Sequence, residues 1–231
     1  MSGVVAEPNA QPKSAGGSAW AILASNAITM AFAWFQHWDL RPLMVIYWCQ
    51  SIIIGGFNFA RMIKLRQFST EGLKSNGQPV PETAKGKWST AIFFAIHYGF
   101  FHVGYLVFLL IEVGGGSPRD RFGGPWEPST IDLFLIGAGI FSFLVGHGIS
   151  FRKNVEADLA GRPNLGTMMF LPYARIIPMH LTIIFGFWFG SQRGAVMLFM
   201  TLKTVADLIM HHVEHRVMQK QSASRAGRGS R

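Results

Sequence analysis

Six long apolar runs constrain the fold of this chain more than any other feature of its sequence. They lie at residues 18–36, 42–60, 89–112, 131–150, 168–190 and 194–215. A helix of about 20 apolar residues crosses the roughly 30 Å hydrocarbon core of a bilayer. The alternating strand pattern of a membrane barrel is absent, so the runs predict helices. We therefore expect an all-α, polytopic transmembrane bundle with six spans in one domain over residues 18–216.

The composition agrees with a membrane protein. Hydrophobic residues make up 49% of the chain and charged residues only 14%, whereas a soluble domain carries about 25% charge. The single cysteine, Cys49, excludes an intrachain disulfide.

Residues 1–17 and the basic segment 217–231 predict disordered tails. We expect residues 67–88 to be a linker without a fold of its own, and 113–130 to be either an external binding loop or a connector.

The distribution of Lys and Arg predicts the orientation. Fifteen of the 21 lie in the N-terminal tail, in 61–88, in 151–167 and in the C-terminal tail, which share one side of a six-span bundle. The loops on the opposite side hold four. Because cytoplasmic loops are enriched in Lys and Arg, both termini are expected in the cytoplasm. The net charge of +9 thus predicts a lipid bilayer as the partner, not a nucleic acid.

Ionisable and polar residues inside the runs are candidates for function, because such groups are costly in lipid and usually face the bundle interior. Their estimated depths, from the helix rise of about 1.5 Å per residue, fall into two tiers. The middle tier contains His102, His180, Lys203 and Gln50, and the lower tier contains His97, Arg175, Asp207, His147 and His211. Arg175 needs an acidic partner, for which Asp207 and Glu214 are available.

The last run carries a polar stripe. Lys203, Asp207 and His211 follow one another at a spacing of four residues, so they share a helical face, and Glu214 lies on the same side. Asp207 and His211 could bind one divalent metal, either zinc or iron, with His97 and His180 as further ligands. The alternative is structural: Lys203 forms a salt bridge with Asp207, and His211 hydrogen-bonds to a neighbouring helix.

Four stretches carry a resemblance to a known family. They are YWCQSIIIGGFNFARM, HYGFF, RIIPMHLTIIFG and LKTVADLIMHHVEH. The chain resembles a family of bacterial integral membrane proteins that is catalogued only as a domain of unknown function. The resemblance implies the bacterial inner membrane and directs attention to His97, His180, Lys203, Asp207 and His211, but it implies no activity.

Four functions fit these observations. The first is an intramembrane metalloenzyme acting on a lipid-like or small substrate, with Asp207, Glu214 and Lys203 as catalytic groups. The second is a proton- or ion-coupled transporter or channel, in which a homodimer would compensate for the small number of spans. The third is a b-type haem protein that pairs His102 with His180, or His147 with His211. In the fourth, the polar groups only fix the packing.

Overall fold

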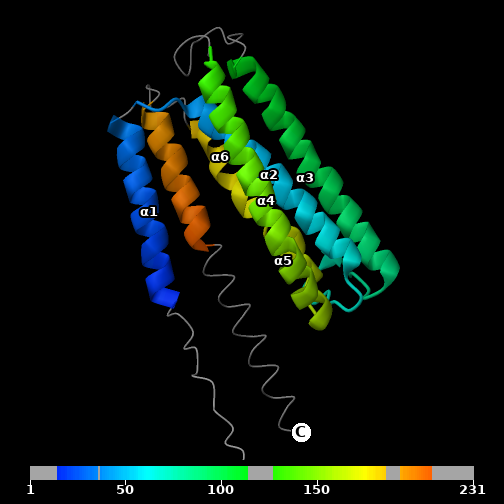
Figure 1. The fold of residues 1–231 in the computed structure, drawn as a ribbon. Coiled ribbons are helices and arrows are strands. Elements are labelled where there is room, and N and C mark those ends of the chain that lie inside the picture. Colours follow the sequence, from blue (N-terminus) through cyan, green and yellow to red (C-terminus); the bar gives the residue numbers. More distant parts are fainter. Residues whose placement is uncertain (1–14, 36, 114–126, 186–192, 210–231) are drawn as a thin grey trace, which may run out of the picture.

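The computed structural model describes residues 15–35, 37–113, 127–185 and 193–209. This part of the chain is mostly helical, which confirms the predicted helical class. Figure 1 shows the helices in chain order: α1 (Ala15–Phe35), α2 (Leu40–Lys64), α3 (Ala84–Val113), α4 (Thr130–Ala160), α5 (Leu165–Phe170) and α6 (Tyr173–Phe185). A further helix over residues 193–209 is drawn in orange. Two short strands, β1 (Lys74–Ser75) and β2 (Gln78–Pro79), lie between α2 and α3.

Four helical segments are long and apolar enough to cross a membrane. They are Leu40–Lys64, Ala84–Ile111, Thr130–Ala160 and Leu165–Phe185, and they correspond to the predicted spans 42–60, 89–112, 131–150 and 168–190. A shorter apolar helix, Asn26–Phe35, lies within the predicted span 18–36. The last predicted span, 194–215, is described only as far as residue 209. The structure thus supports a membrane protein with four candidate spans, and the count of six remains a prediction.

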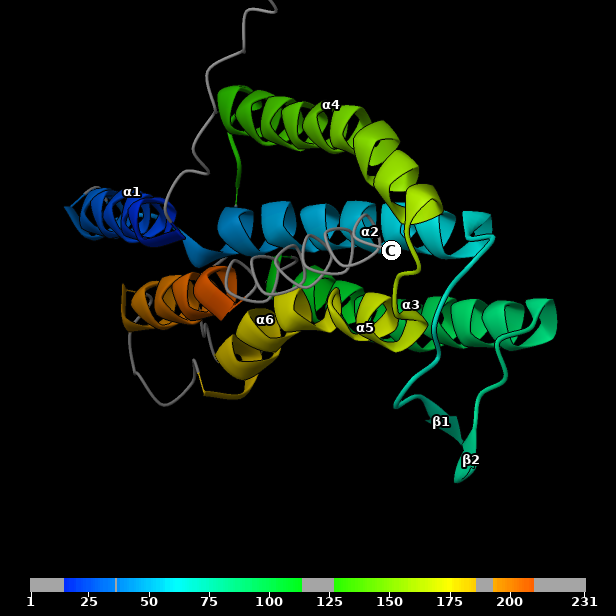
Figure 2. The same ribbon diagram turned by 90° about the horizontal axis from the view of Figure 1, so that it is seen from below.

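Helix α2 lies at the centre of the bundle. Figure 2 shows α4 on one side of α2 and the layer of α3, α5 and α6 on the other. Besides Leu40, the buried residues of α2 recur every three or four positions: Arg41, Met44, Tyr47, Ser51, Gly55, Asn58 and Met62. This is the spacing of one helical face. The candidate site is therefore built on a helix with neighbours on both sides.

Capping side chains define where α2 and α4 begin. Asp39 accepts a hydrogen bond from the backbone N–H of Arg41 at 2.8 Å and also pairs with the Arg41 guanidinium. Ser129 and Asp132 form a reciprocal capping box at the start of α4. Such caps satisfy backbone N–H groups that have no partner within the helix.

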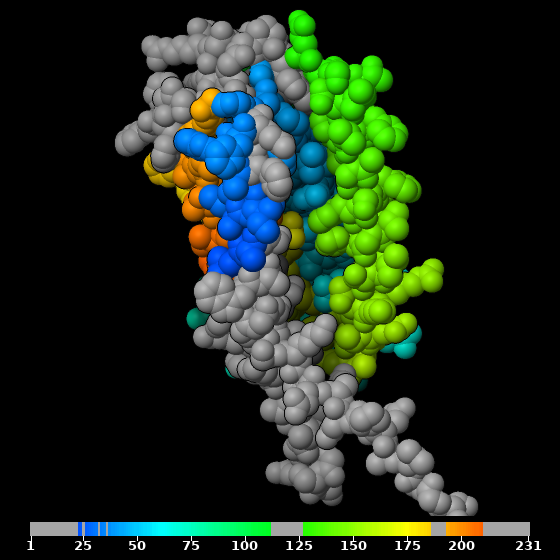
Figure 3. Space-filling view, turned by 60° about the vertical axis from the view of Figure 1, so that its left-hand side comes forward, coloured from blue at the N-terminus to red at the C-terminus, as the bar shows by residue number. Residues whose placement is uncertain are grey.

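Helix α4 is attached to the bundle along one side only. None of its most apolar window is buried inside the protein, and Figure 3 shows it forming one flank of the molecule with α2 beside it. At its far end the guanidinium of Arg61 on α2 holds the buried carboxylate of Asp158 with two hydrogen bonds of 2.7 and 2.9 Å. In a bilayer the exposed apolar side chains of α4 would face lipid.

A break at Pro172 separates α5 from α6. Pro178 lies within α6 without ending it, whereas the helix is interrupted at Leu171 and Pro172. Pro172 has no N–H to donate to the carbonyl of Met168, four residues earlier. The side-chain amide of Asn58 on α2 donates to that carbonyl instead, at 2.8 Å. The break therefore creates a direct bond between α5 and α2.

The segment between α2 and α3 is ordered, so the prediction of a linker without its own fold is wrong. β1 and β2 form an antiparallel hairpin around Asn76 and Gly77, both with positive φ. Asn-Gly is the preferred pair for such a turn. Ser69 exchanges two backbone hydrogen bonds with the segment after α4, donating to Pro163 at 2.9 Å and accepting from Leu165 at 2.8 Å.

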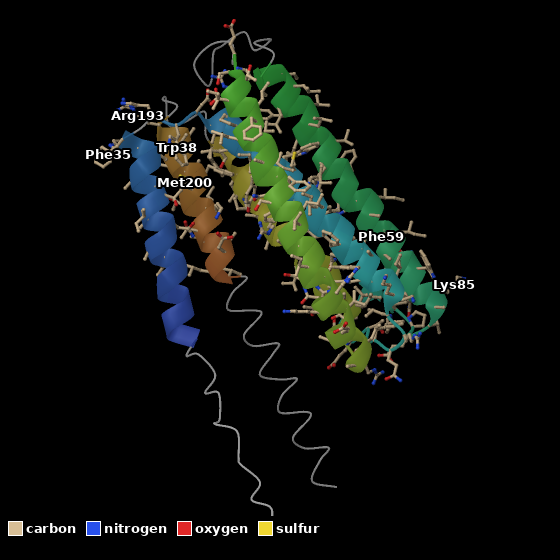
Figure 4. All side chains as sticks on the ribbon, viewed as in Figure 1. Phe35, Trp38, Phe59, Lys85, Arg193 and Met200 are labelled. Carbon is tan, nitrogen blue, oxygen red and sulfur yellow. The ribbon has the colours of Figure 1, made fainter. Side chains whose placement is uncertain are left out.

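The two ends of the bundle differ in character. Figure 4 shows Lys85 at the hairpin end, and Trp38 and Arg193 at the opposite end. Arg193 donates to Nε2 of His37 at 3.1 Å, and its guanidinium lies 5.9 Å from the ring of Trp34. These contacts join the start of the 193–209 helix to the end of α1. Most basic residues of the predicted cytoplasmic side, including 61–66, lie at the hairpin end.

Glu82 gives the hairpin a pH dependence. The backbone N–H of Thr70 donates to its carboxylate, and the nearby Arg162 guanidinium acts in the same direction, so the pKa of Glu82 lies below its ordinary value of 4.5. A carboxyl whose pKa is lowered on folding stabilises the fold above its unfolded pKa and ceases to do so as the pH falls through the folded value. We expect Glu82→Gln to reduce amide protection of residues 69–82 at pH 6, and wild-type protein to lose protection only below about pH 4.5.

Hydrogen–deuterium exchange, expressed as protection factors, measures this effect. Glu71→Gln is the matched control, because Glu71 is exposed in the same loop. Equal protection factors in the Glu82 and Glu71 variants would contradict the stabilising role of the Glu82 carboxylate.

Candidate functional site

The centre of the bundle contains a buried hydrogen-bond network between α2 and α3. The hydroxyl of Tyr98 donates to the backbone carbonyl of Ser51 at 2.9 Å. Because that phenol has only one proton, the Ser51 hydroxyl must donate to the phenol oxygen, which lies 2.7 Å from it. Gly55 makes the arrangement possible, since a Cβ at this position would lie 2.9 Å from Cδ1 of the Tyr98 ring.

His102 extends this network but leaves one nitrogen without a partner. Its Nδ1 lies 2.8 Å from the carbonyl oxygen of Tyr98, so Nδ1 carries the proton and donates. In the neutral ring, Nε2 then has a free lone pair. Nε2 is buried and has no hydrogen-bond partner in the described part of the chain. Trp48 of α2 donates to the backbone carbonyl of His102 at 3.0 Å, which fixes the register of α2 against α3.

Two further histidines bridge α3 and α6 through tyrosine hydroxyls. Nδ1 of His97 lies 2.8 Å from the hydroxyl of Tyr173, and Nδ1 of His180 lies 3.1 Å from the hydroxyl of Tyr105. The ring of Phe101 packs against all four of these side chains. The two predicted metal ligands on these helices are thus each engaged with a phenol.

The last described helix carries an ion pair. Nζ of Lys203 donates to Oδ2 of Asp207 at 2.6 Å, and the side chains are 31% and 23% exposed. This is the salt bridge that the sequence allowed as the structural alternative. His211 and Glu214 lie outside the described residues, so their places in the predicted stripe are not tested.

Two further polar residues lie within the bundle, Arg175 on α6 and Tyr47 on α2. Arg175 is half-buried and its guanidinium lies 5.9 Å from the ring of Phe143 on α4. No salt bridge to Arg175 occurs among the described residues. Both Tyr47 and Tyr98 lie within electrostatic range of Arg175. The ring of Tyr47 contacts the edge of Phe199, one turn before Lys203, at 5.2 Å.

The remaining predicted residues lie at the margin of this centre. His147 stacks on Phe143 with a centroid distance of 4.1 Å and lies within electrostatic range of Arg175. Gln50 is half-buried on α2. Among the residues that the structure describes, no three His, Cys, Asp or Glu side chains gather as a metal site would require. The zinc or iron site at His97, His180, Asp207 and His211, and the haem pairs, therefore remain predictions.

The hydroxyl partners were not predicted from the sequence. The hydroxyls of Tyr98, Tyr105 and Tyr173 form these hydrogen bonds, and the ring of Tyr47 packs against Phe199. A signal existed, because Tyr98 precedes His102 by one helical turn and Tyr105 follows it closely. Phenols are uncharged and were not among the candidate residues, yet a buried phenol also requires a hydrogen-bond partner.

The fold and the interior polar groups define a class of protein: a helical membrane protein with hydrogen-bonded and charged side chains between its helices. The model of a protein family described as "Family of unknown function (DUF6498)" matches residues 9–224. The chain therefore belongs to this family. No curated protein and no solved structure matches it significantly.

Gly55 provides a test of the central network. Gly55→Ala would force the new methyl group into the ring of Tyr98, which two hydrogen bonds hold in place. We expect a loss of about 1–3 kcal/mol in stability, as for other overpacked interiors. Gly56→Ala is the matched control, since its methyl group would meet no atom within 4 Å. Thermal unfolding of the two variants in detergent measures the difference, and equal melting temperatures would contradict the packing described.

Proposed function

We propose that this protein is a transporter or channel of the bacterial inner membrane that moves protons or a small ion. The observation that carries the proposal is the set of tyrosine contacts between α2, α3 and α6. These phenols link Ser51, His97 and His180 across helices that are long and apolar enough to span a membrane. The contacts form three separate pairs. A hydrogen-bonded imidazole and phenol can exchange a proton, and polar groups between spanning helices mark proton paths in transporters.

The ion pair supports the same function. Charged groups in a spanning helix are retained at a cost in free energy unless they are paired. Lys203 and Asp207 are paired with each other, yet each keeps a quarter to a third of its side chain exposed. A partly exposed pair can open and close as an ion or proton passes, which a fully packed structural bridge cannot do.

A metal-dependent enzyme is less well supported. Its proposed ligands Asp207, His97 and His180 are bonded to Lys203, Tyr173 and Tyr105 respectively. The bonds to the two histidines use Nδ1 and leave Nε2 available, but within the described residues no three His, Cys, Asp or Glu side chains gather around one point. Coordination by His211 rests on the sequence spacing alone. The predicted homodimer is retained as part of the proposal, because it would compensate for the small number of spans.

Flux through proteoliposomes tests the function. We expect Asp207→Asn and Lys203→Met to lower proton or ion flux at least about tenfold, the effect of raising the barrier by roughly 1.4 kcal/mol. Lys85→Met is the matched control, because it removes a lysine from an exposed position at the end of the bundle. Wild-type protein that carries no flux with any common cation or anion, in vesicles where the protein is folded, would refute the proposal.

Orientation is tested separately. We propose cytoplasmic termini, with the hairpin end of the bundle facing the cytoplasm. In a Cys49→Ala background, Arg193→Cys should react with a membrane-impermeant maleimide added to intact cells whose outer membrane has been permeabilised, whereas Lys85→Cys should react only after lysis. The two positions lie at opposite ends of the bundle. The reverse labelling pattern would contradict the proposed orientation, because the hairpin end would then face away from the cytoplasm.

A further inference from the structure

Two histidines are exposed on spanning helices. His97 on α3 and His180 on α6 are exposed, although both lie inside candidate spans, Ala84–Ile111 and Leu165–Phe185. Ionisable side chains within spans usually face the bundle interior, because lipid offers them no hydrogen-bond partner. His102 on α3 follows this rule and is buried. The exposed pair therefore requires a polar partner outside the single chain.

Each of the two imidazoles has one ring nitrogen available. Nδ1 of His97 lies 2.8 Å from the hydroxyl of Tyr173, and Nδ1 of His180 lies 3.1 Å from the hydroxyl of Tyr105. Within the described part of the chain, Nε2 of neither ring takes part in a hydrogen bond. Since a neutral imidazole carries one donor and one acceptor, each ring can form one more hydrogen bond.

The two histidines and the ring of Phe101 follow one another along the bundle. The Phe101 ring lies 5.2 Å from the ring of His97 and 6.4 Å from the ring of His180. His97 precedes Phe101 by one turn of α3, and His180 contacts Tyr105, which follows Phe101 by one turn. One turn rises about 5.4 Å along the helix axis. We call His97, Phe101 and His180 the α3–α6 face, and its three rings run in the direction in which the helices cross the membrane.

We propose that a second copy of this chain covers the α3–α6 face, so that this face is the contact surface of a homodimer. The inference rests on the homodimer that is part of the proposed function and names its interface. Two copies inserted in the same orientation are related by a two-fold axis along the membrane normal. Each residue near that axis then meets its own counterpart at the same depth, and the α3–α6 face runs along this direction.

The chemistry of the imidazole selects an identical partner. A two-fold interface needs groups that are complementary to themselves. A carboxylate or an ammonium group would repel its own copy, whereas a neutral imidazole can donate in one copy and accept in the other. The bond between the two copies of His97 joins two tyrosine–histidine pairs into one chain, which runs from Tyr173 through both imidazoles to the second Tyr173.

Helix α4 presents a different kind of surface. Its large exposed side chains, such as Phe134 and Phe141, are apolar, and lipid alone satisfies them. Figure 2 shows α4 and the layer of α3 and α6 on opposite sides of α2. The two surfaces are therefore separate and can be tested against each other.

Cross-linking in membranes locates the interface. In a Cys49→Ala background, Phe100→Cys should give a disulfide-linked dimer on oxidation with iodine, because Phe100 is 73% exposed and neighbours Phe101. Phe141→Cys is the matched control on α4, where the side chain is 66% exposed, and it should give none. Cross-linking through Phe141→Cys alone would overturn the proposal, and so would equal cross-linking at both positions, the result of random collision.

The affinity of the dimer tests the role of the imidazole. It is measured by energy transfer between labelled full-length proteins in liposomes of increasing lipid-to-protein ratio. His97→Phe keeps an aromatic ring beside Phe93 and Phe101 but loses the hydrogen bond, so we expect dimerisation to weaken about tenfold. His97→Gln supplies a donor and an acceptor again and should restore most of the affinity.

Ser142→Ala is the control for this measurement, because it removes a polar group from an exposed position on α4 and should leave the affinity unchanged. Equal affinity of the wild type and His97→Phe would overturn the proposal. A wild type that stays monomeric at every ratio would also overturn it, and the α3–α6 face would then belong to a lipid-soluble molecule or to another protein.

Dimerisation and flux separate the two proposals. A dimer through the α3–α6 face in protein that carries no flux would refute transport and retain the interface. Proton or ion flux through monomeric protein would retain transport and refute the interface.

Discussion

The hydrogen bonds between Tyr98 and Ser51 are the interaction on which the rest of the bundle depends. They join α2 to α3 at 2.7 and 2.9 Å in a setting where water cannot replace them. In lipid the apolar surface of a helix gains little by meeting another apolar surface, so close packing and interhelical hydrogen bonds must hold helices together. Gly55 allows the Tyr98 ring to approach the α2 backbone, and the backbone carbonyl of Tyr98 orients His102 by accepting a hydrogen bond from its Nδ1.

Other polar side chains attach α5 and α4 to α2. Asn58 replaces the N–H that Pro172 lacks and so ties α5 to α2, while Arg61 ties α4 to α2 through Asp158. Buried ion pairs of this kind specify position more than they add stability, because desolvation offsets much of the attraction. α4 is consequently held firmly near the hairpin and has few polar contacts along its apolar length.

The sequence was sufficient to predict the helices but insufficient to predict the partners of their polar residues. Apolar runs determine where helices form in a membrane protein, because lipid imposes both length and composition. α2, α3, α4 and the α5–α6 pair overlap four of the predicted runs, although the break between α5 and α6 was not predicted. The hairpin was missed although its Asn-Gly turn was visible, because a polar loop between spans was assumed to lack structure. Depth estimates grouped His102 with His180 and His97 with Arg175. They could not determine rotation between helices, so the pairing of each of His97 and His180 with a tyrosine emerged only from the structure.

The interior polar groups differ in whether the chain itself satisfies them. Lys203 and Asp207 cancel one another, and the hydroxyls of Ser51 and Tyr98 satisfy one another, so both pairs can exist in an empty bundle at little cost. Tyr47 and His102 differ, because the buried Tyr47 hydroxyl and Nε2 of His102 have no hydrogen-bond partner within the described residues. The difference separates the polar groups that build the fold from those that the described residues leave unsatisfied.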